Sequence, residues 1–320
     1  MTGMTPLETH NEIPHYTFIK TIQDNHRYKV SIIEQDGEER ILKKCNDPEL
    51  AGMLYHDVRS SFYLETVRSY NIESVFRVRK IYSYGDDWYI AEKFDGDKLY
   101  ERRPVRSLEY DIRIARDLYA PFIYETSVYT PQVMLGKNPY VDVQGEPTKN
   151  YHDAIAELER HARVAVEGNF LDKRQAETII AYVRKHLKEV KYGVELYDLE
   201  PWEMFVLPEY QLGVIDLEYL NLRGRRHFDV VYDYLRLWLD VKRPAVARAM
   251  LQRYMEIAAG EDLKGAFLSL FGIKLVGYLM DAANWMKDTR ELGKPVVYSH
   301  DETQAILNRY LEFSVEALYT

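Results

Sequence analysis

Residues 15–45 contain three short runs in which apolar residues are interspersed with polar ones, HYTFIKTI, RYKVSIIE and ERILKKC. The runs are rich in β-branched and aromatic residues and are separated by polar turns, a pattern that predicts β-strands. Between the second and third runs, the pair Asp36-Gly37 favours a tight hairpin, because Asp-Gly tolerates the positive φ of a primed turn. The chain is therefore expected to begin with antiparallel strands.

A helical period follows these strands. Asp47 is expected to cap a helix whose first turn contains Pro48. Apolar residues then form an approximate helical stripe through residues 50–70: Leu54, Val58, Phe62, Leu64 and Val67. Two more runs typical of strands, VFRVRKIYSY and DDWYIAEKF, end at Phe94.

After Gly96 the pattern becomes mainly helical, with one expected strand-turn-strand unit at 195–220. Helices are expected at 107–120, 151–167, 172–191 and, with breaks near Pro244, Gly260, Gly293 and Pro295, through 228–318. Four prolines in 121–150 indicate a long irregular segment. We therefore expect a flexible tail at 1–14, a β-rich N-lobe at 15–95 and a helical C-lobe at 96–320.

Composition narrows the class of protein. The chain has 42 Lys and Arg against 51 Asp and Glu, a net charge of −9, which argues against a nucleic-acid partner. A single cysteine, Cys45, and an N-terminus without an apolar stretch favour the cytoplasm. The most apolar segment, 265–285, is interrupted by Lys274 and Asp281, so we expect a buried core helix and no membrane partner.

Two motifs that carry carboxylates lie in the 195–220 unit. The first is LYDLEPWE, which contains Asp198, and the second is GVIDLEY, which contains Asp216. A hairpin between them would bring both aspartates to one end. Taken singly, neither aspartate can be told from an ordinary turn residue at the end of a short strand.

Together with the order of elements, these motifs resemble the protein-kinase-like fold, most closely its aminoglycoside/choline phosphotransferase branch. The resemblance covers about residues 18–285. The first motif is similar to the family's His-Gly-Asp-Leu-His-Pro-Gly-Asn loop at Asp198, Leu199 and Pro201, and the second nearly reproduces Gly-Val-Ile-Asp-Trp-Glu-Tyr. The resemblance implies an α+β, two-lobed fold, with a small antiparallel-sheet N-lobe bearing one helix and a larger, mainly helical C-lobe.

The resemblance also implies an ATP- and metal-dependent phosphotransferase that acts on a small hydroxylated or amino-bearing acceptor. Phosphoryl transfer needs positioning and charge neutralisation. Asp198 would accept the proton of the acceptor hydroxyl as the catalytic residue. Asp216 would hold magnesium (Mg²⁺ or Mn²⁺) against the phosphates of ATP, and Glu203, at the place of the family's metal-binding Asn, would be a second ligand.

The nucleotide contacts implied by the resemblance lie in the N-lobe. Strand alternation puts Lys43 and Lys44 on opposite faces, and the family pattern favours Lys43 as the phosphate contact, with Glu65 of the following helix as its orienting partner. Backbone groups near Glu92 and Phe94 would meet adenine. Two further carboxylates, Glu218 and Asp229, have either an acceptor-facing or a structural role.

The chain departs from the family at three places. The turn Gln23–Arg27 replaces a Gly-rich loop, Leu196 replaces the loop His, and Glu203 replaces the loop Asn. These departures support an alternative: a pseudokinase that binds a nucleotide or a protein partner without phosphotransfer. The sequence leaves the acceptor and the oligomeric state open.

Overall fold

The computed structural model describes residues 12–70, 73–100, 106–128, 151–196, 199–292 and 299–316. These residues form two compact units, each described by itself. The first holds the described residues up to 100 together with those of 196–221, and the second holds those of 106–128, 151–195 and 222–316. The predicted tail, 1–14, lies almost wholly outside the described residues, and the predicted lobe boundary after residue 95 stays a prediction.

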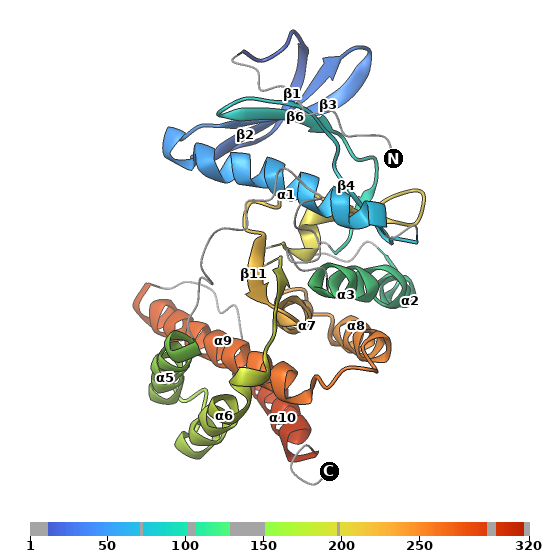
Figure 1. Ribbon diagram of the computed structural model, residues 1–320. Coiled ribbons are helices and arrows are strands. Elements are labelled where there is room, and N and C mark those ends of the chain that lie inside the picture. The colour runs from blue at the N-terminus through green and yellow to red at the C-terminus, as the bar shows by residue number, and fades with distance from the viewer. Residues whose placement is uncertain are drawn as a thin grey trace. The chain divides into compact units, whose positions relative to one another are not determined.

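The first unit contains a five-stranded antiparallel sheet of order β1-β2-β3-β6-β5 (Figure 1). Its strands are β1 (Thr17–Asp24), β2 (Tyr28–Gln35), β3 (Glu38–Cys45), β5 (Ile81–Tyr84) and β6 (Trp88–Glu92). The hairpin between β2 and β3 turns at Asp36 and Gly37, whose φ angles are 57° and 80°. Both angles are positive, as the Asp-Gly pair predicts.

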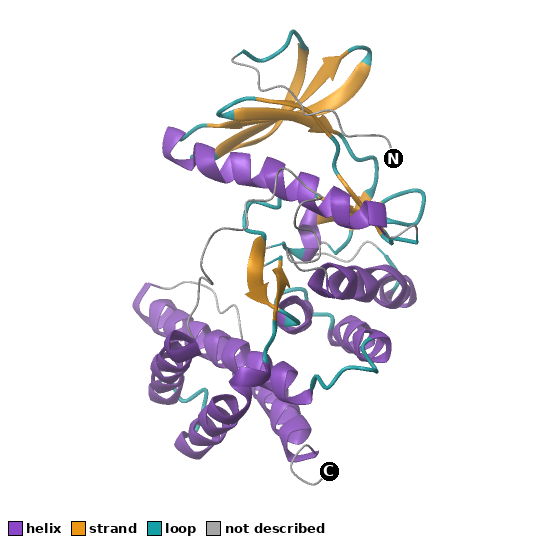
Figure 2. Cartoon of the chain, in the orientation of Figure 1, coloured by secondary structure: helices purple, strands orange, loops and turns teal. Residues whose placement is uncertain are grey.

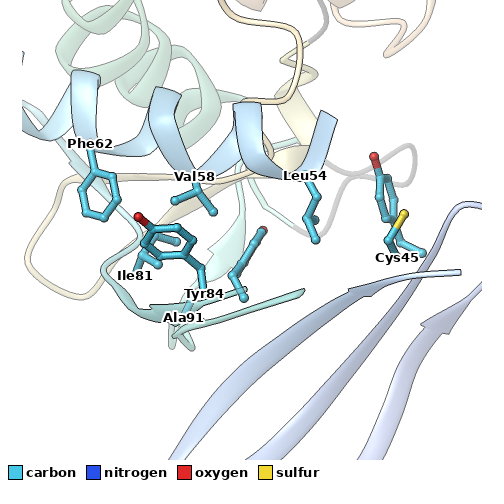
Figure 3. Packing of buried hydrophobic residues seen from close by; sticks show 9 residues of the cluster. Cys45, Leu54, Val58, Phe62, Ile81, Tyr84 and Ala91 are labelled. Atoms are coloured by element: carbon cyan, nitrogen blue, oxygen red, sulfur yellow. The ribbon is translucent and has the colours of Figure 1, made fainter. Parts of the chain in front are cut away.

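Helix α1 (Ala51–Tyr70) packs on this sheet. Asp47 caps the short 3-10 turn that leads into it, η1 (Pro48–Leu50), by accepting a hydrogen bond from the backbone nitrogen of Glu49. In Figure 3, the side chains of Leu54, Val58 and Phe62 extend from α1 toward the strands. The remaining buried members of this cluster are Tyr28, Cys45, Ile81, Tyr84, Tyr89 and Ala91. Burying each large apolar side chain contributes about 1.5–3 kcal/mol, so the predicted stripe holds α1 on the sheet.

A second, four-stranded sheet of order β4-β10-β9-β7 completes the first unit. It comprises β4 (Phe76–Val78), β7 (Asp97–Lys98), β9 (Met204–Val206) and β10 (Leu212–Val214). Strand β10 runs antiparallel to β9 and parallel to β4. The predicted strand-turn-strand unit is therefore the β9–β10 hairpin, and its pairing with β4 ties the C-terminal carboxylate motif to the N-terminal part of the chain.

The second unit is mainly helical (Figure 2). Its helices are α2 (Leu108–Ile114), α3 (Ala120–Val128), α5 (Tyr151–Glu167), α6 (Lys173–His186), α7 (Phe228–Leu239), α8 (Pro244–Ile257), α9 (Lys264–Leu292) and α10 (His300–Glu316). A 3-10 turn, η3 (Leu187–Glu189), follows α6, and β8 (Tyr192–Glu195) pairs with β11 (Asn221–Arg225). With the two sheets of the first unit, these helices confirm the predicted α+β class.

The structure corrects the predicted irregular segment 121–150 at its start. Residues 121–128 are helical, because α3 continues from a π-helical turn, η2 (Ala115–Tyr119), and Pro121 falls in its first turn. A widened turn satisfies its backbone groups differently from an α-helix, which lets the chain accommodate a proline that lacks an N–H. The rest of the predicted segment, 129–150, lies outside the described residues.

Helix α9 confirms the predicted buried core helix. Its span Lys264–Trp285 is long and apolar enough to cross a membrane, but 72% of the apolar window is buried inside the structure. Core helices of globular proteins have the same composition. Within the second unit, α9 packs against α5, α6 and α10, which provide that burial.

Candidate active site

Lys43 lies at the centre of a buried charge network in the first unit. It extends from β3, and its side-chain Nζ donates to Asp216 Oδ1 at 2.7 Å and to Asp57 Oδ2 at 3.2 Å. Only 5% of Lys43 is exposed. Lys44, on the other face of β3, is exposed and lies 3.8 Å from Asp87. The choice that strand alternation left open is therefore decided: Lys43 faces the carboxylates.

The charge on Lys43 is maintained by its neighbours. Burial by itself opposes a charged ammonium, but Tyr89 and then the surrounding carboxylates act in the other direction and hold the pKa of Lys43 well above its usual value. The ring of Tyr28 also lies 4.6 Å from Nζ, within the range of a cation–π contact. Lys43 is therefore a fixed positive charge, suited to bind an anion.

Asp57, rather than Glu65, is the helix partner of Lys43, which corrects the predicted pair. Asp57 accepts hydrogen bonds on Oδ2 from Lys43 and from the Tyr89 hydroxyl at 2.9 Å. Glu65 instead pairs with Arg68, one turn further along α1, at 2.6 and 2.9 Å. Eight residues separate Asp57 from Glu65 on the helix, about 12 Å along its axis, so the two carboxylates cannot serve the same ammonium.

The sequence does indicate Asp57 as the partner of Lys43, although the family pattern pointed to Glu65. Asp57 lies between Leu54 and Val58 on the apolar stripe of α1, and it is buried. A carboxylate on the core-facing side of a helix requires a partner, because burying an unpaired charge is costly. The first acidic residue on that stripe was therefore the better candidate for the partner of a buried lysine.

Asp216 and Glu218 follow the end of β10. Asp216 adopts a left-handed backbone conformation, with φ of 62°, which directs its carboxylate to Lys43. Glu218 is buried; its Oε1 accepts a hydrogen bond from Arg27 at 2.5 Å, and its Oε2 lies 3.8 Å from Lys43 Nζ. This Oε2 atom is buried without a hydrogen-bond partner among the described residues. The nearly complete GVIDLEY match thus supplies two carboxylates to one network.

The sequence did not predict the contact of Arg27 with Glu218. Arg27 ends the turn that stands in place of a Gly-rich loop, and Asn25 orders this turn by accepting hydrogen bonds from the backbone nitrogens of Arg27 and Tyr28, both at 2.8 Å. The Arg27 guanidinium bonds Glu218 and donates to the Tyr219 hydroxyl at 3.0 Å. An arginine in a short polar turn gives no sequence signal of its own, because such residues are usually solvated.

Two carboxylates of this network, Asp216 and Glu218, are of the ligand type that binds a divalent cation. Hard cations such as Mg²⁺ prefer carboxylate oxygens. Asp216 is partly exposed and bonds Lys43 through Oδ1 only, and the unpartnered Oε2 of Glu218 is a second oxygen in the same network. In the described part of the chain, no group of three or more His, Cys, Asp or Glu side chains is close enough to hold a metal. The predicted catalytic residue, Asp198, lies outside the described residues.

Glu203 has a local structural contact. It lies in the 3-10 turn η4 (Pro201–Glu203) that precedes β9, and its Oε2 accepts a hydrogen bond from the backbone nitrogen of Glu200 at 2.9 Å. A carboxylate in this reciprocal capping arrangement stabilises the turn. Its assignment as a metal ligand stays a prediction.

Glu92, expected near adenine with Phe94, is the last residue of β6, and Phe94 lies on the segment that connects β6 to β7. Phe94 is buried, and its ring lies 6.2 Å from that of Phe205. Gly213 leaves room for it, because a Cβ at this position would come within 2.8 Å of the Phe94 ring. Glu92 pairs with Arg77. The contact of these residues with adenine stays a prediction.

Asp229 belongs to the second unit. It lies in the first turn of α7, two residues after His227, which has the left-handed conformation, and it is buried. The expected position, an aspartate at the start of a helix, is observed. Carboxylates in the first turn interact favourably with the helix dipole, which is consistent with a structural role.

Comparison with known proteins gives structural relatives only. No family model matches the chain, and no curated protein matches its sequence. Among solved structures, a putative aminoglycoside phosphotransferase from Ralstonia eutropha JMP134 is similar over 96% of this chain and 95% of its own, with a TM-score of 0.62 and 12% identity. The ADP-bound aminoglycoside phosphotransferase APH(2″)-Ib is similar over 95% of this chain and 94% of its own, with a TM-score of 0.52 and 14% identity.

A macrolide 2′-phosphotransferase of type I is also similar, over 84% of this chain and 87% of its own, with a TM-score of 0.53 and 12% identity. The chain therefore has the kinase-like fold of the aminoglycoside and macrolide phosphotransferases. The low identity makes it a divergent example of that fold. The expected fold resemblance is confirmed.

Proposed function

We propose that this chain is an ATP- and metal-dependent phosphotransferase that acts on a small hydroxylated or amino-bearing molecule. The observation that carries the proposal is the buried Lys43, placed between Asp57 and Asp216. This arrangement occurs in a fold whose solved examples include an ADP-bound aminoglycoside phosphotransferase and a streptomycin-ATP ternary complex. Their names support a nucleotide and a small-molecule acceptor as the substrates.

In this proposal Lys43 binds the phosphates of the nucleotide, and Asp57 orients Lys43 and neutralises part of its charge. Asp216, with Glu218 or Glu203, would hold Mg²⁺ or Mn²⁺, which when bound would neutralise phosphate charge. Asp198 would orient the acceptor hydroxyl and accept its proton. These roles would be sufficient to catalyse phosphoryl transfer, because that reaction depends mainly on positioning and electrostatic stabilisation.

Nucleotide binding should require the metal. Asp216, Glu218 and Glu203 are carboxylates that would face a polyanion, and two unit charges 4 Å apart repel by about 4 kcal/mol at an effective dielectric constant near 20. A cation removes this repulsion. The cytoplasm remains the proposed location, consistent with the single cysteine.

A thermal-shift titration with ATP and with GTP, each with and without Mg²⁺ or Mn²⁺, tests the proposal. A ligand at 100 times its dissociation constant stabilises the folded state by about 2.7 kcal/mol. We expect a metal-dependent shift for the wild-type protein and none for Asp216→Asn. The matched control is Asp87→Asn, the same chemical change at a surface carboxylate that pairs with Lys44.

If the shift is found, ADP release is then measured across aminoglycosides, macrolides, sugars and choline-like alcohols to find the acceptor. A shift without turnover on any acceptor would identify a nucleotide-binding module. No shift with any nucleotide or metal would contradict the proposal and favour a pseudokinase that binds a protein partner.

A further inference from the structure

The first unit contains a cavity that does not include Lys43, Asp57 or Asp216. It has a volume of about 760 Å³ and lies between the C-terminal half of α1 and the β4–β5 segment. Its apolar lining includes Phe62, Val78, Ile81 and Tyr82. Small-molecule sites have volumes of roughly 300–1,000 Å³, so the cavity is large enough for one.

The charged lining of this cavity is mainly positive. Four cationic side chains line it, Arg68, Arg77, Arg79 and Lys80, against two carboxylates, Glu65 and Glu92. This excess of two positive charges occurs in a chain whose net charge is −9. The surroundings are therefore opposite in sign to the protein as a whole, which favours an anionic ligand here.

Two of the four cations are already neutralised. Arg68 pairs with Glu65, and Arg77 pairs with Glu92. These pairs account for both carboxylates of the cavity. The first pair also explains why Glu65, which the family resemblance assigned to Lys43, is not available to it.

Arg79 and Lys80 remain without a carboxylate partner in the described part of the chain. The Nε atom of Arg79 is buried and makes no hydrogen bond to a described residue. Lys80 is exposed, and its Nζ lies 5.0 Å from the centre of the Tyr82 ring. A buried guanidinium nitrogen without an acceptor is costly, and an anion that supplies acceptor oxygens would remove that cost.

We propose that this cavity, which we call the α1–β5 cavity, binds a small molecule that carries a phosphate group on an apolar or aromatic body. The planar fork of an arginine matches phosphate oxygens, and a lysine adds a point charge. Phe62 and Tyr82 are aromatic surfaces for the body of the ligand. The cavity does not include Lys43, Asp57 or Asp216, and the proposal does not depend on the phosphotransferase function.

Isothermal titration calorimetry with phenyl phosphate, inorganic phosphate and phenol tests the site. We expect saturable binding of phenyl phosphate, weaker binding of inorganic phosphate and none of phenol. The double variant Arg79→Gln/Lys80→Gln should bind phenyl phosphate at least tenfold more weakly. The matched control, Lys185→Gln/Lys188→Gln, removes the same charge from exposed positions of the second unit and should bind as the wild type does.

A repeat with saturating ATP and Mg²⁺ separates this site from the nucleotide site. Binding at the α1–β5 cavity should persist, whereas displacement by ATP would overturn the proposal. Equal affinity of the wild type and the double variant, or the absence of saturable binding, would overturn it as well.

Circular dichroism melting of each variant checks that a loss of binding does not reflect unfolding. Saturable binding of a phosphoserine peptide without binding of phenyl phosphate would assign the cavity to a macromolecular partner instead.

Discussion

The carboxylate of Asp57 accepts a hydrogen bond from the backbone nitrogen of Leu217 at 2.8 Å, across 160 residues of sequence. This bond uses Oδ1, and the other oxygen accepts from Lys43. Because Leu217 follows Asp216 directly, Asp57 positions both the lysine and the backbone that carries Asp216. Helix α1 is thus linked to the two charged groups on which the proposed function depends.

Replacing Asp57 should destabilise the protein strongly. Asp57→Asn removes one of the two close carboxylates that neutralise the buried Lys43, and removing a partner of a buried ion pair costs about 3–5 kcal/mol. Since Asp216 remains, we expect a decrease of about 3 kcal/mol in the free energy of unfolding, measured with urea. Glu65→Gln is the control: its pair with Arg68 is about one-third exposed, so the cost should be under about 1 kcal/mol. Equal costs for the two variants would show that Asp57 does not neutralise the buried Lys43 in solution.

Arg27 and Glu218 should be energetically coupled. Their side chains are 30% and 5% exposed, so the pair is only partly screened by solvent. A double-mutant cycle with Arg27→Gln and Glu218→Gln should give a coupling energy of about 1–3 kcal/mol by urea unfolding. The same cycle on Lys44 and Asp87, which are 3.8 Å apart and about half exposed, should give less than about 0.5 kcal/mol. A coupling no larger than this control would show that the turn is not anchored in solution.

Two glycine substitutions should have opposite effects on stability. Gly213→Ala places a Cβ 2.8 Å from the Phe94 ring and 3.0 Å from a Leu207 methyl group, so a decrease of about 1–3 kcal/mol is expected. Gly52→Ala lies in α1 with nothing within 4 Å of the new methyl group, and should stabilise the helix by about 0.5–1 kcal/mol. Thermal or urea unfolding compares both variants with the wild type. A Gly213→Ala variant as stable as the wild type would mean that Phe94 is not packed against this strand.

Stability should decrease as the pH falls below about 6.5, in part because of His227. Burial, and then the charges of Arg226 and Lys191, lower the pKa of His227 to about 3. The unfolded chain takes up a proton near pH 6.5 and the folded chain does not, so the neutral form stabilises the fold above that pH. Each unit of pH below it costs about 1.4 kcal/mol from this residue.

His227→Asn tests this assignment, because asparagine also tolerates the left-handed backbone at this position. Urea unfolding at pH 5, 6, 7 and 8 should give a pH dependence shallower by one proton in the variant. His56 and His161, whose pKa values burial also lowers, should leave a residual slope in both proteins. An unchanged slope would show that His227 titrates normally.

Local sequence was sufficient for three features of the first unit, but not for all of its strands: the run VFRVRKIYSY, expected as one strand, forms β4 and β5 in separate sheets. The Asp36-Gly37 turn, the cap at Asp47 and the apolar stripe of α1 each depend on residues close together in the chain, and all three are observed. The error at Pro121 has a local cause as well. A proline usually interrupts a helix, but the π-helical turn before it allows the helix to continue.

The sequence by itself determined most kinds of element, their general order and the carboxylate motif that contains Asp216, because these depend on hydrophobic period, turn chemistry and short-range spacing. Only the tertiary structure decided the contacts of Lys43. Strand alternation places Lys43 and Lys44 on opposite faces of β3 but does not say which face is buried. Which carboxylate pairs with Lys43 depends on the path of α1 over the sheet, and this path brings Asp57 to it. Contacts such as Arg27 with Glu218, 191 residues apart, follow from how the chain folds back on itself, and no local pattern carries that information.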